Sequence, residues 1–163
     1  MTGVHFTLED AGIQETLDAY LKKLTNTGLF LLDVGEYMML AHRDRWDREV
    51  APDGQAWAPL SEVTLARKAA KGRPTAILVD TTALRDLLRY SVTASQLVFG
   101  TDRVYGTTQQ FGAEKGQFGA DKHGRPLPWG DIPARPWLGL SDADREHIQG
   151  LLEAHSNSAA AGV

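Results

Sequence analysis

The chain has 163 residues, of which 42% are hydrophobic and 23% are charged, as expected for one globular domain with a sizeable core. It contains no cysteine, which excludes disulfides, thiolate metal sites and cysteine nucleophiles. The formal net charge of −4 lacks the basic footprint of a general nucleic-acid-binding domain.

The sequence indicates no membrane segment. Its most apolar stretch, residues 28–41, is interrupted by Asp33 and Glu36 and is too short to span a bilayer. The first residues show no basic segment followed by an apolar run, so no signal peptide is indicated.

The N-terminal third predicts a short strand followed by two helices. Apolar residues at positions 4, 6 and 8 alternate with polar ones, as in a strand with one buried face. Asp10 is a plausible N-cap for a helix with apolar residues at helical spacing up to residue 24. A longer helix is expected over about 29–48. We expect its apolar first half to be buried and its charged second half to project into solvent.

The next segment predicts two further helices. Ser61 is a good N-cap for a helix that reaches about Lys71, with a glycine and a proline shortly after it. A short apolar element follows at 77–79. Asp80 or Thr81 then caps a short helix that ends near residue 88.

The strongest strand signal is a β-hairpin. Apolar and polar residues alternate over 90–94, and a second apolar run at 97–99 follows after a tight link. Val104 and Tyr105 then begin either a third strand or a short helix.

The C-terminal third predicts a protruding arm and a final helix. Residues 113–130 are rich in Gly, Lys, Asp and Pro, which favours a long loop or an extended hairpin arm. Residues 141–144 resemble a capping box, and the helix that they open places Ile148 and Leu152 on one face. The small-residue segment 156–163 is expected to be a flexible tail.

These elements predict an α+β fold. The order is helices, then a small antiparallel sheet, then a helix, so we expect N-terminal helices packed on the sheet. Residues 1–155 should form a single domain, with 113–130 as its arm.

No motif for catalysis, a cofactor or a metal is evident. The five histidines are scattered, and no pair has the spacing that places two imidazoles on one helical face. Asp44 and Asp47, like Asp142 and Asp144, lie in a charged helical surface or at a helix start, where solvation and capping explain them. We therefore predict no catalytic, cofactor-binding or metal-binding residues.

A basic segment is the one candidate contact for a phosphate or an acidic partner. Its cations are Arg67, Lys68, Lys71 and Arg73, at the end of a predicted helix. The alternative is a solvated helix C-terminus, where cations suit the helix dipole.

Two rigid segments combine proline with a large aromatic anchor. They are residues 57–60 and 133–138, and each contains a tryptophan. Trp and Arg dominate interface energetics, and proline lowers the entropy cost of ordering a segment. The alternative is that both tryptophans fold back onto the core of their own chain, which is compatible with an interface nearby.

Taken together, these elements resemble the phage virion morphogenesis family, the tail completion or head–tail joining proteins of Mu-like and P2-like phages. The resemblance covers roughly Val34 to Leu152 and depends on the order and spacing of its elements. They are Gly54-x-x-Trp57-x-Pro59-Leu60-Ser61, the basic helix, Ile77-Leu78 with Thr82-x-Leu84-Arg85, Gln110-Phe111-Gly112, and Ile132-Pro133-Ala134-Arg135-Pro136-Trp137-Leu138-Gly139.

The resemblance implies a structural protein of the phage neck, located in the virion and in the host cytoplasm during assembly. It implies a homo-oligomeric ring, expected to be a hexamer, that contacts tail terminator or tail tube proteins and head-side connector or portal proteins. DNA would pass through the lumen without sequence-specific binding. The expected interface residues are Trp57, Pro59, Leu60, Phe111, Arg135, Pro136 and Trp137.

Two alternatives to this neck protein remain at the level of sequence. One is a nucleic-acid-binding accessory protein that uses the basic segment at 67–73. The other is a small hydrolase built on the scattered carboxylates, which would need a pocket of converging acids with perturbed pKa values.

Overall fold

A computed structural model describes residues 4–6, 27–81 and 83–161. The predicted helix between Asp10 and residue 24 lies outside the described residues. The elements are β1 (Val4–Phe6), α2 (Thr27–Arg48), α3 (Glu62–Ala70), α4 (Ala83–Asp86), β2 (Arg89–Val92), β3 (Leu97–Thr101), α5 (Tyr105–Phe111) and α6 (Asp142–Ala161).

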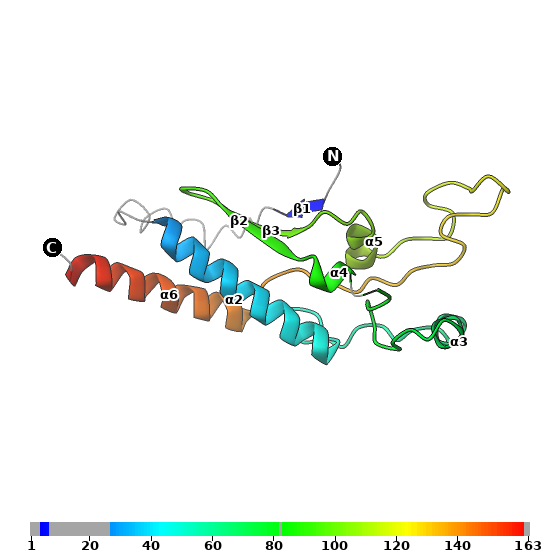
Figure 1. The fold of residues 1–163 in the computed structure, drawn as a ribbon, viewed down its shortest axis with the longest axis horizontal. Coiled ribbons are helices and arrows are strands. Elements are labelled where there is room, and N and C mark those ends of the chain that lie inside the picture. The colour runs from blue at the N-terminus through cyan, green and yellow to red at the C-terminus, as the bar shows by residue number, and fades with distance from the viewer. Residues whose placement is uncertain (1–3, 7–26, 82, 162–163) are drawn as a thin grey trace.

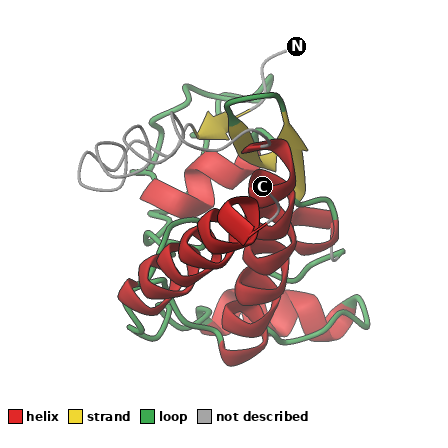
Figure 2. Cartoon of the chain, turned by 90° about the vertical axis from the view of Figure 1, so that its left-hand side faces the viewer, coloured by secondary structure: helices red, strands yellow, loops and turns green. Residues whose placement is uncertain are grey.

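The described chain forms an elongated α+β fold, as the sequence predicts (Figure 1). The two long helices, α2 and α6, lie side by side and antiparallel at one end of the long axis. The sheet contacts α2, while α3 and a projecting loop occupy the other end (Figures 1 and 2). Helices on a small sheet therefore build one half, and loops tied by side chains build much of the other.

The sheet has three antiparallel strands in the order β1-β3-β2. The predicted hairpin is confirmed: Tyr90 pairs with Phe99 and Val92 pairs with Leu97. β1 adds to the other edge of β3, with Phe6 opposite Phe99. Val104 and Tyr105 do not form a strand; they begin the short helix α5.

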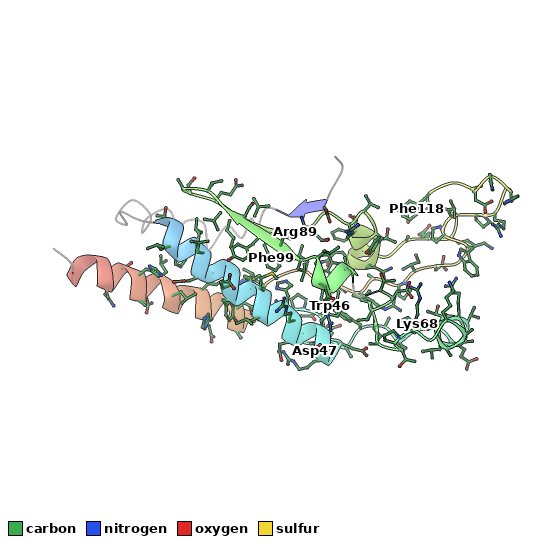
Figure 3. All side chains as sticks on the ribbon, in the orientation of Figure 1. Trp46, Asp47, Lys68, Arg89, Phe99 and Phe118 are labelled. Atoms are coloured by element: carbon green, nitrogen blue, oxygen red, sulfur yellow. The ribbon has the colours of Figure 1, made fainter. Side chains whose placement is uncertain are left out.

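The core forms where α2, the sheet, α6 and the loop tryptophans meet. Trp46 and Phe99 lie in this interior (Figure 3). Its buried hydrophobic residues are Phe30, Leu31, Val34, Met38, Trp46, Ala51, Trp57, Ile77, Val79, Leu84, Leu88, Phe99, Trp137, Ile148 and Leu152.

The prediction that the second half of α2 projects into solvent is wrong for one face. Met38, His42 and Trp46 repeat at i, i+4 and i+8, so they form one stripe that stays buried to the end of the helix. Only the opposite face carries exposed charges, such as the Asp44–Arg48 pair. Because the second half of α2 is rich in charged residues, its sequence pattern does not reveal this buried stripe.

Local capping signals fix the helix starts. The Ser61 side chain accepts a hydrogen bond from the backbone N of Thr64 at the start of α3. At the start of α6, Asp144 N donates to Ser141 Oγ at 3.0 Å and Ser141 N donates to Asp144 Oδ2 at 2.7 Å. The predicted capping box is thus confirmed. Helix α6 continues through Ala161, so Ser156, where the tail was expected to start, is helical.

Asp144 also belongs to a buried polar cluster that joins α2 to α6. Arg45 Nη1 donates to Asp144 Oδ2 at 2.5 Å, and the Tyr37 hydroxyl donates to Asp144 Oδ1 at 2.8 Å. Burial alone raises the pKa of Asp144, but the bonds from Ser141 and Tyr37 and the charge of Arg45 outweigh it, so the net pKa is lowered. Burial and the Asp144 hydrogen bond raise the pKa of Tyr37 to about 12.

His42 lies beside this cluster and is fully buried. Its Nδ1 lies 2.7 Å from the carbonyl oxygen of Met38, which can only accept, so Nδ1 carries the proton of the neutral ring. Burial, followed by the charge of Arg45, lowers the pKa of His42 from 6.5 to about 4.

This pKa makes the free energy of unfolding depend on pH. Between pH 6.5 and 4 the unfolded chain takes up a proton at His42 and the folded chain does not, so stability falls as pH falls. At about 1.4 kcal/mol per pH unit, His42 contributes a loss of about 3 kcal/mol over this window. We expect His42→Leu to flatten the dependence of the unfolding free energy on pH in this window, as measured by urea unfolding at each pH. The control His123→Gln, at an exposed histidine, should leave that dependence unchanged.

Gly35 marks a close approach of α2 to the sheet. A Cβ built at this position would lie 2.5 Å from Cδ2 of the Tyr90 ring. We expect Gly35→Ala to destabilise the fold by about 1–3 kcal/mol, because overpacking outweighs the gain in helix propensity. Thermal unfolding measures this.

Gly150 is the matched control for Gly35. It also lies in a long helix, but nothing lies within 4 Å of a Cβ placed there. Gly150→Ala should therefore stabilise the protein by up to about 1 kcal/mol through helix propensity. Equal shifts in melting temperature for the two variants would contradict the packing that we describe.

Candidate assembly surface

Residues 132–139, which we call the strap, return from the projecting loop and run through the middle of the molecule. The strap belongs to no strand, and one side chain, Gln110 of α5, satisfies much of its backbone. Gln110 Oε1 accepts from the backbone N of Trp137 at 2.9 Å and of Leu138 at 3.0 Å, and Nε2 donates to Leu138 O at 2.9 Å.

The strap places the Trp137 indole in the core. Its ring is 2% exposed, lies 5.5 Å from the Trp46 ring, and donates through Nε1 to the carbonyl oxygen of Gly106 at 3.0 Å. A Cβ at Gly106 would lie 3.3 Å from Trp137 Cζ2, so the glycine in α5 gives the indole its space.

The two aromatic-proline segments bind each other. Trp57 Nε1 donates to Pro136 O at 2.7 Å. In return, Arg135 Nε donates to Ala58 O at 2.7 Å and Arg135 Nη2 donates to Pro59 O at 3.0 Å. Burial lowers the pKa of Arg135. Each of the two segments therefore donates hydrogen bonds to the backbone of the other.

This arrangement divides the predicted interface residues into two groups. Trp57, Arg135 and Trp137 are buried within their own chain. The other four are at least partly exposed: Pro59, Leu60, Phe111 and Pro136. Both tryptophans are thus packed in the core of their own chain, as the alternative interpretation expected.

The basic segment is also partly internal. Lys68 is only 8% exposed, and its Nζ donates to the carbonyl oxygens of Pro74, Ala76 and Val79 at 2.5–2.8 Å. Burial lowers its pKa. Lys68 therefore shapes the 74–79 loop and has little exposed surface to offer the phosphate or acidic-partner contact predicted from sequence.

The remaining cations of this segment differ in their surroundings. Arg73 pairs with Asp80, whereas Lys71 is exposed at the C-cap of α3. The Arg67 guanidinium lies 5.0 Å from the centre of the Trp129 ring, a cation–π contact between α3 and the projecting loop. The four cations therefore do not form one continuous phosphate-binding row.

The projecting loop is an ordered hairpin-like arm, residues 113–132. At its base, Ala113 and Ile132 exchange backbone hydrogen bonds of 2.8 and 2.9 Å. A Cβ on Gly112 would lie 2.7 Å from Ile132 O, and Gly112 has a φ of +76°, so the base needs glycine. Farther out, Phe118 N donates to Leu127 O at 2.7 Å.

The tip of the arm is fixed by Asp121. Its carboxylate accepts from the backbone N of His123 at 2.8 Å and of Arg125 at 3.0 Å. It also accepts from Arg125 Nε at 2.7 Å, and these bonds lower its pKa. The arm thus has one defined conformation although it lacks a continuous β-ladder.

The arm exposes large apolar side chains. Phe118 is 56% exposed, Leu127 40% and Trp129 61%, and Phe118 lies well away from the core (Figure 3). Exposed hydrophobic residues that gather on one segment mark interaction sites. Within the part of the chain that the structure describes, the arm is therefore a strong candidate for contact with another protein.

Two grooves flank the strap. The larger, about 930 Å³, is the α2–α6 groove, and its lining includes Tyr37, Leu40, Asp44, Arg48, Pro52, Asp53, Pro136, Leu140 and Asp142. The smaller, about 520 Å³, is the α3–α5 groove, and its lining includes Pro59, Leu60, Arg67, Leu78, Tyr105, Ile132 and Pro133. Pro136, Pro59 and Leu60 of the predicted interface therefore line grooves.

Within the described residues, no three His, Cys, Asp or Glu side chains are placed to hold a metal ion. None of the helices in this part of the chain is long and apolar enough to cross a membrane.

The hydrogen bonds between Gln110 and the strap allow us to predict how much stability is lost when the Gln110 amide is removed. Gln110→Leu would leave two backbone N–H groups of the strap without their acceptor, each worth about 1–3 kcal/mol where buried. We expect a loss of about 2–4 kcal/mol in unfolding free energy, measured by chemical denaturation.

The neighbouring glutamine is the control for Gln110. Gln109 holds the strap through its backbone carbonyl, which accepts from Arg135 N at 2.7 Å, so Gln109→Leu keeps this bond. An equal loss in both variants would show that the amide of Gln110 does not hold the strap.

Comparison with known proteins agrees with this architecture. The family model described as the phage virion morphogenesis family matches residues 8–156, which include α2, the strap, the arm and most of α6. No curated protein and no solved structure matched significantly. Since the family match covers nearly the whole sequence, the chain belongs to the phage virion morphogenesis family.

Proposed function

We propose that this protein is a structural component of the phage neck that completes the tail and joins it to the DNA-filled head. Membership of the virion morphogenesis family supports a role in building the phage particle. The proposal gives the protein a place in the virion neck, and in the host cytoplasm while particles assemble.

The ordered arm with its three exposed apolar side chains is the observation that carries this proposal. Phe118, Leu127 and Trp129 remain exposed on a segment whose base and tip are held by hydrogen bonds. A segment fixed before binding loses little conformational entropy when it docks. These properties suit a protein whose work is to fit against its neighbours in an assembly rather than to turn over a substrate.

Joining a head to a tail around DNA favours a closed ring of copies. A ring requires heterologous contacts, in which one face of a subunit meets a different face of the next. A hexamer is the ring that we propose, between tail terminator or tail tube proteins and the connector or portal of the head. The net charge of −4 suits a lumen that DNA crosses without binding tightly.

The arm can be removed with little change to the rest of the fold. Because Ala113 and Ile132 already pair at its base, an Asn-Gly turn can replace residues 114–131 and close a hairpin there. We call this variant the armless chain. We expect it to fold, with circular dichroism and a melting temperature close to those of the full chain.

When a phage encodes the armless chain in place of the full chain, we expect infected cells to accumulate heads and tails that are not joined. Electron microscopy and the titre of infectious particles measure this outcome. The purified full-length protein should form a closed ring, alone or on isolated tails, as its mass in solution would reveal. Normal titres from the armless chain would refute the role of the arm, and a chain that stays monomeric with tails would refute the ring.

A further inference from the structure

The molecule is electrically uneven along its long axis. In α6, Asp142, Asp144, Glu146 and Glu153 stand against the single cation Arg145. At the other end, α3 and the 71–73 turn hold four Lys or Arg residues against the single acid Glu62, while the arm holds three residues of each sign (Figure 1). Subunits placed head to tail would therefore bring opposite charges together.

The basic end carries an apolar surface that extends from the fold. Lys122 is exposed at the tip of the arm, and the exposed rings of Phe118 and Trp129 lie behind it on the same arm. The Asp121–Arg125 pair balances its own charge, so Lys122 gives the tip a positive excess.

The α2–α6 groove combines apolar surface with a small negative excess, because its lining holds four Asp and three Arg residues. Leu40, which is 64% exposed, together with Pro52, Pro136 and Leu140 supplies apolar surface. Asp53 lies on the lining and accepts only a backbone hydrogen bond, from Gln55 N, among the bonds described for it. The groove's volume, about 930 Å³, is at the upper end of the range for pockets that enclose whole ligands.

We propose that the arm of one copy inserts into the α2–α6 groove of the next copy. Phe118 and Leu127 would cover Leu40 and its apolar neighbours, and Lys122 would approach Asp53. The arm projects away from α2 and α6 of its own chain, so it does not fill the groove of its own chain (Figure 1). This inference rests on the proposed ring and names the contact that closes it.

Two variants, one without the arm and one with a damaged groove, test this contact. The armless chain keeps the groove, whereas Leu40→Glu keeps the arm and places a charge in the groove. On isolated tails or alone, wherever the full-length protein forms rings, each variant by itself should remain monomeric. An equimolar mixture should give a dimer with one copy of each and nothing larger, since only one arm and one groove remain functional.

Native mass spectrometry and sedimentation measure these species, and two further variants control for folding. Leu29→Glu places the same charge at another exposed leucine of α2, one that does not line the groove, so it should assemble fully. Phe118→Ser alters the arm without removing it and should weaken assembly at least tenfold.

The outcomes separate this docking contact from the ring itself. Rings formed by the armless chain or by Leu40→Glu alone would overturn the docking contact and leave the ring standing. A mixture that yields no dimer, or a Leu29→Glu variant that fails like Leu40→Glu, would also overturn it. If the full-length protein forms no ring even on tails, the ring fails and the docking contact fails with it.

Discussion

The fold depends on how the strap satisfies its backbone while it places Arg135 and Trp137 in the interior. A half-buried segment outside any sheet has no ladder partner, yet the N–H and C=O groups that it removes from solvent must still be paired. Here the Gln110 amide, the carbonyl of Gln109 and the indole of Trp57 pair them one at a time. Arg135 of the strap returns the support by binding the carbonyls of residues 58 and 59. Three segments distant in the sequence thus hold each other, and the helices and sheet pack around them.

Features encoded locally could be predicted from the sequence. The hairpin at 89–101, the Ser61 cap and the capping box at 141–144 each depend on residues a few positions apart, and each occurs as predicted. Contacts with distant partners could not be predicted. Lys68 has the pattern of a surface cation because its three carbonyl partners come from the 74–79 loop. The partners of the Trp57 and Trp137 rings lie 79 and 31 residues away, so the sequence left open whether these rings pack within their own chain. The buried stripe of α2 was hidden because charged residues surround it.

The elements that carry the family resemblance mostly hold the subunit together. Trp57, Gln110, Arg135 and Trp137 act inside the chain, while Phe118, Leu127 and Trp129, which are exposed on the arm, lie in a segment without a recognisable pattern. The resemblance therefore depends mainly on residues that build the fold, and the exposed apolar side chains of the arm lie outside its pattern. This separation is expected physically, because internal contacts restrict residue type more tightly than an arm surface that needs only to be apolar and ordered.

The base of the arm has a mechanical consequence. One leg leaves directly from the end of α5 and the other continues into the strap, with Gly112 packed tightly against Ile132 and Ala134 where they meet. No slack linker separates the arm from the interior. Tension applied to the arm would thus be borne by the contacts of Gln110, Arg135 and the buried Trp137 ring, so the arm and the rest of the fold would move as one stiff body instead of bending at a hinge.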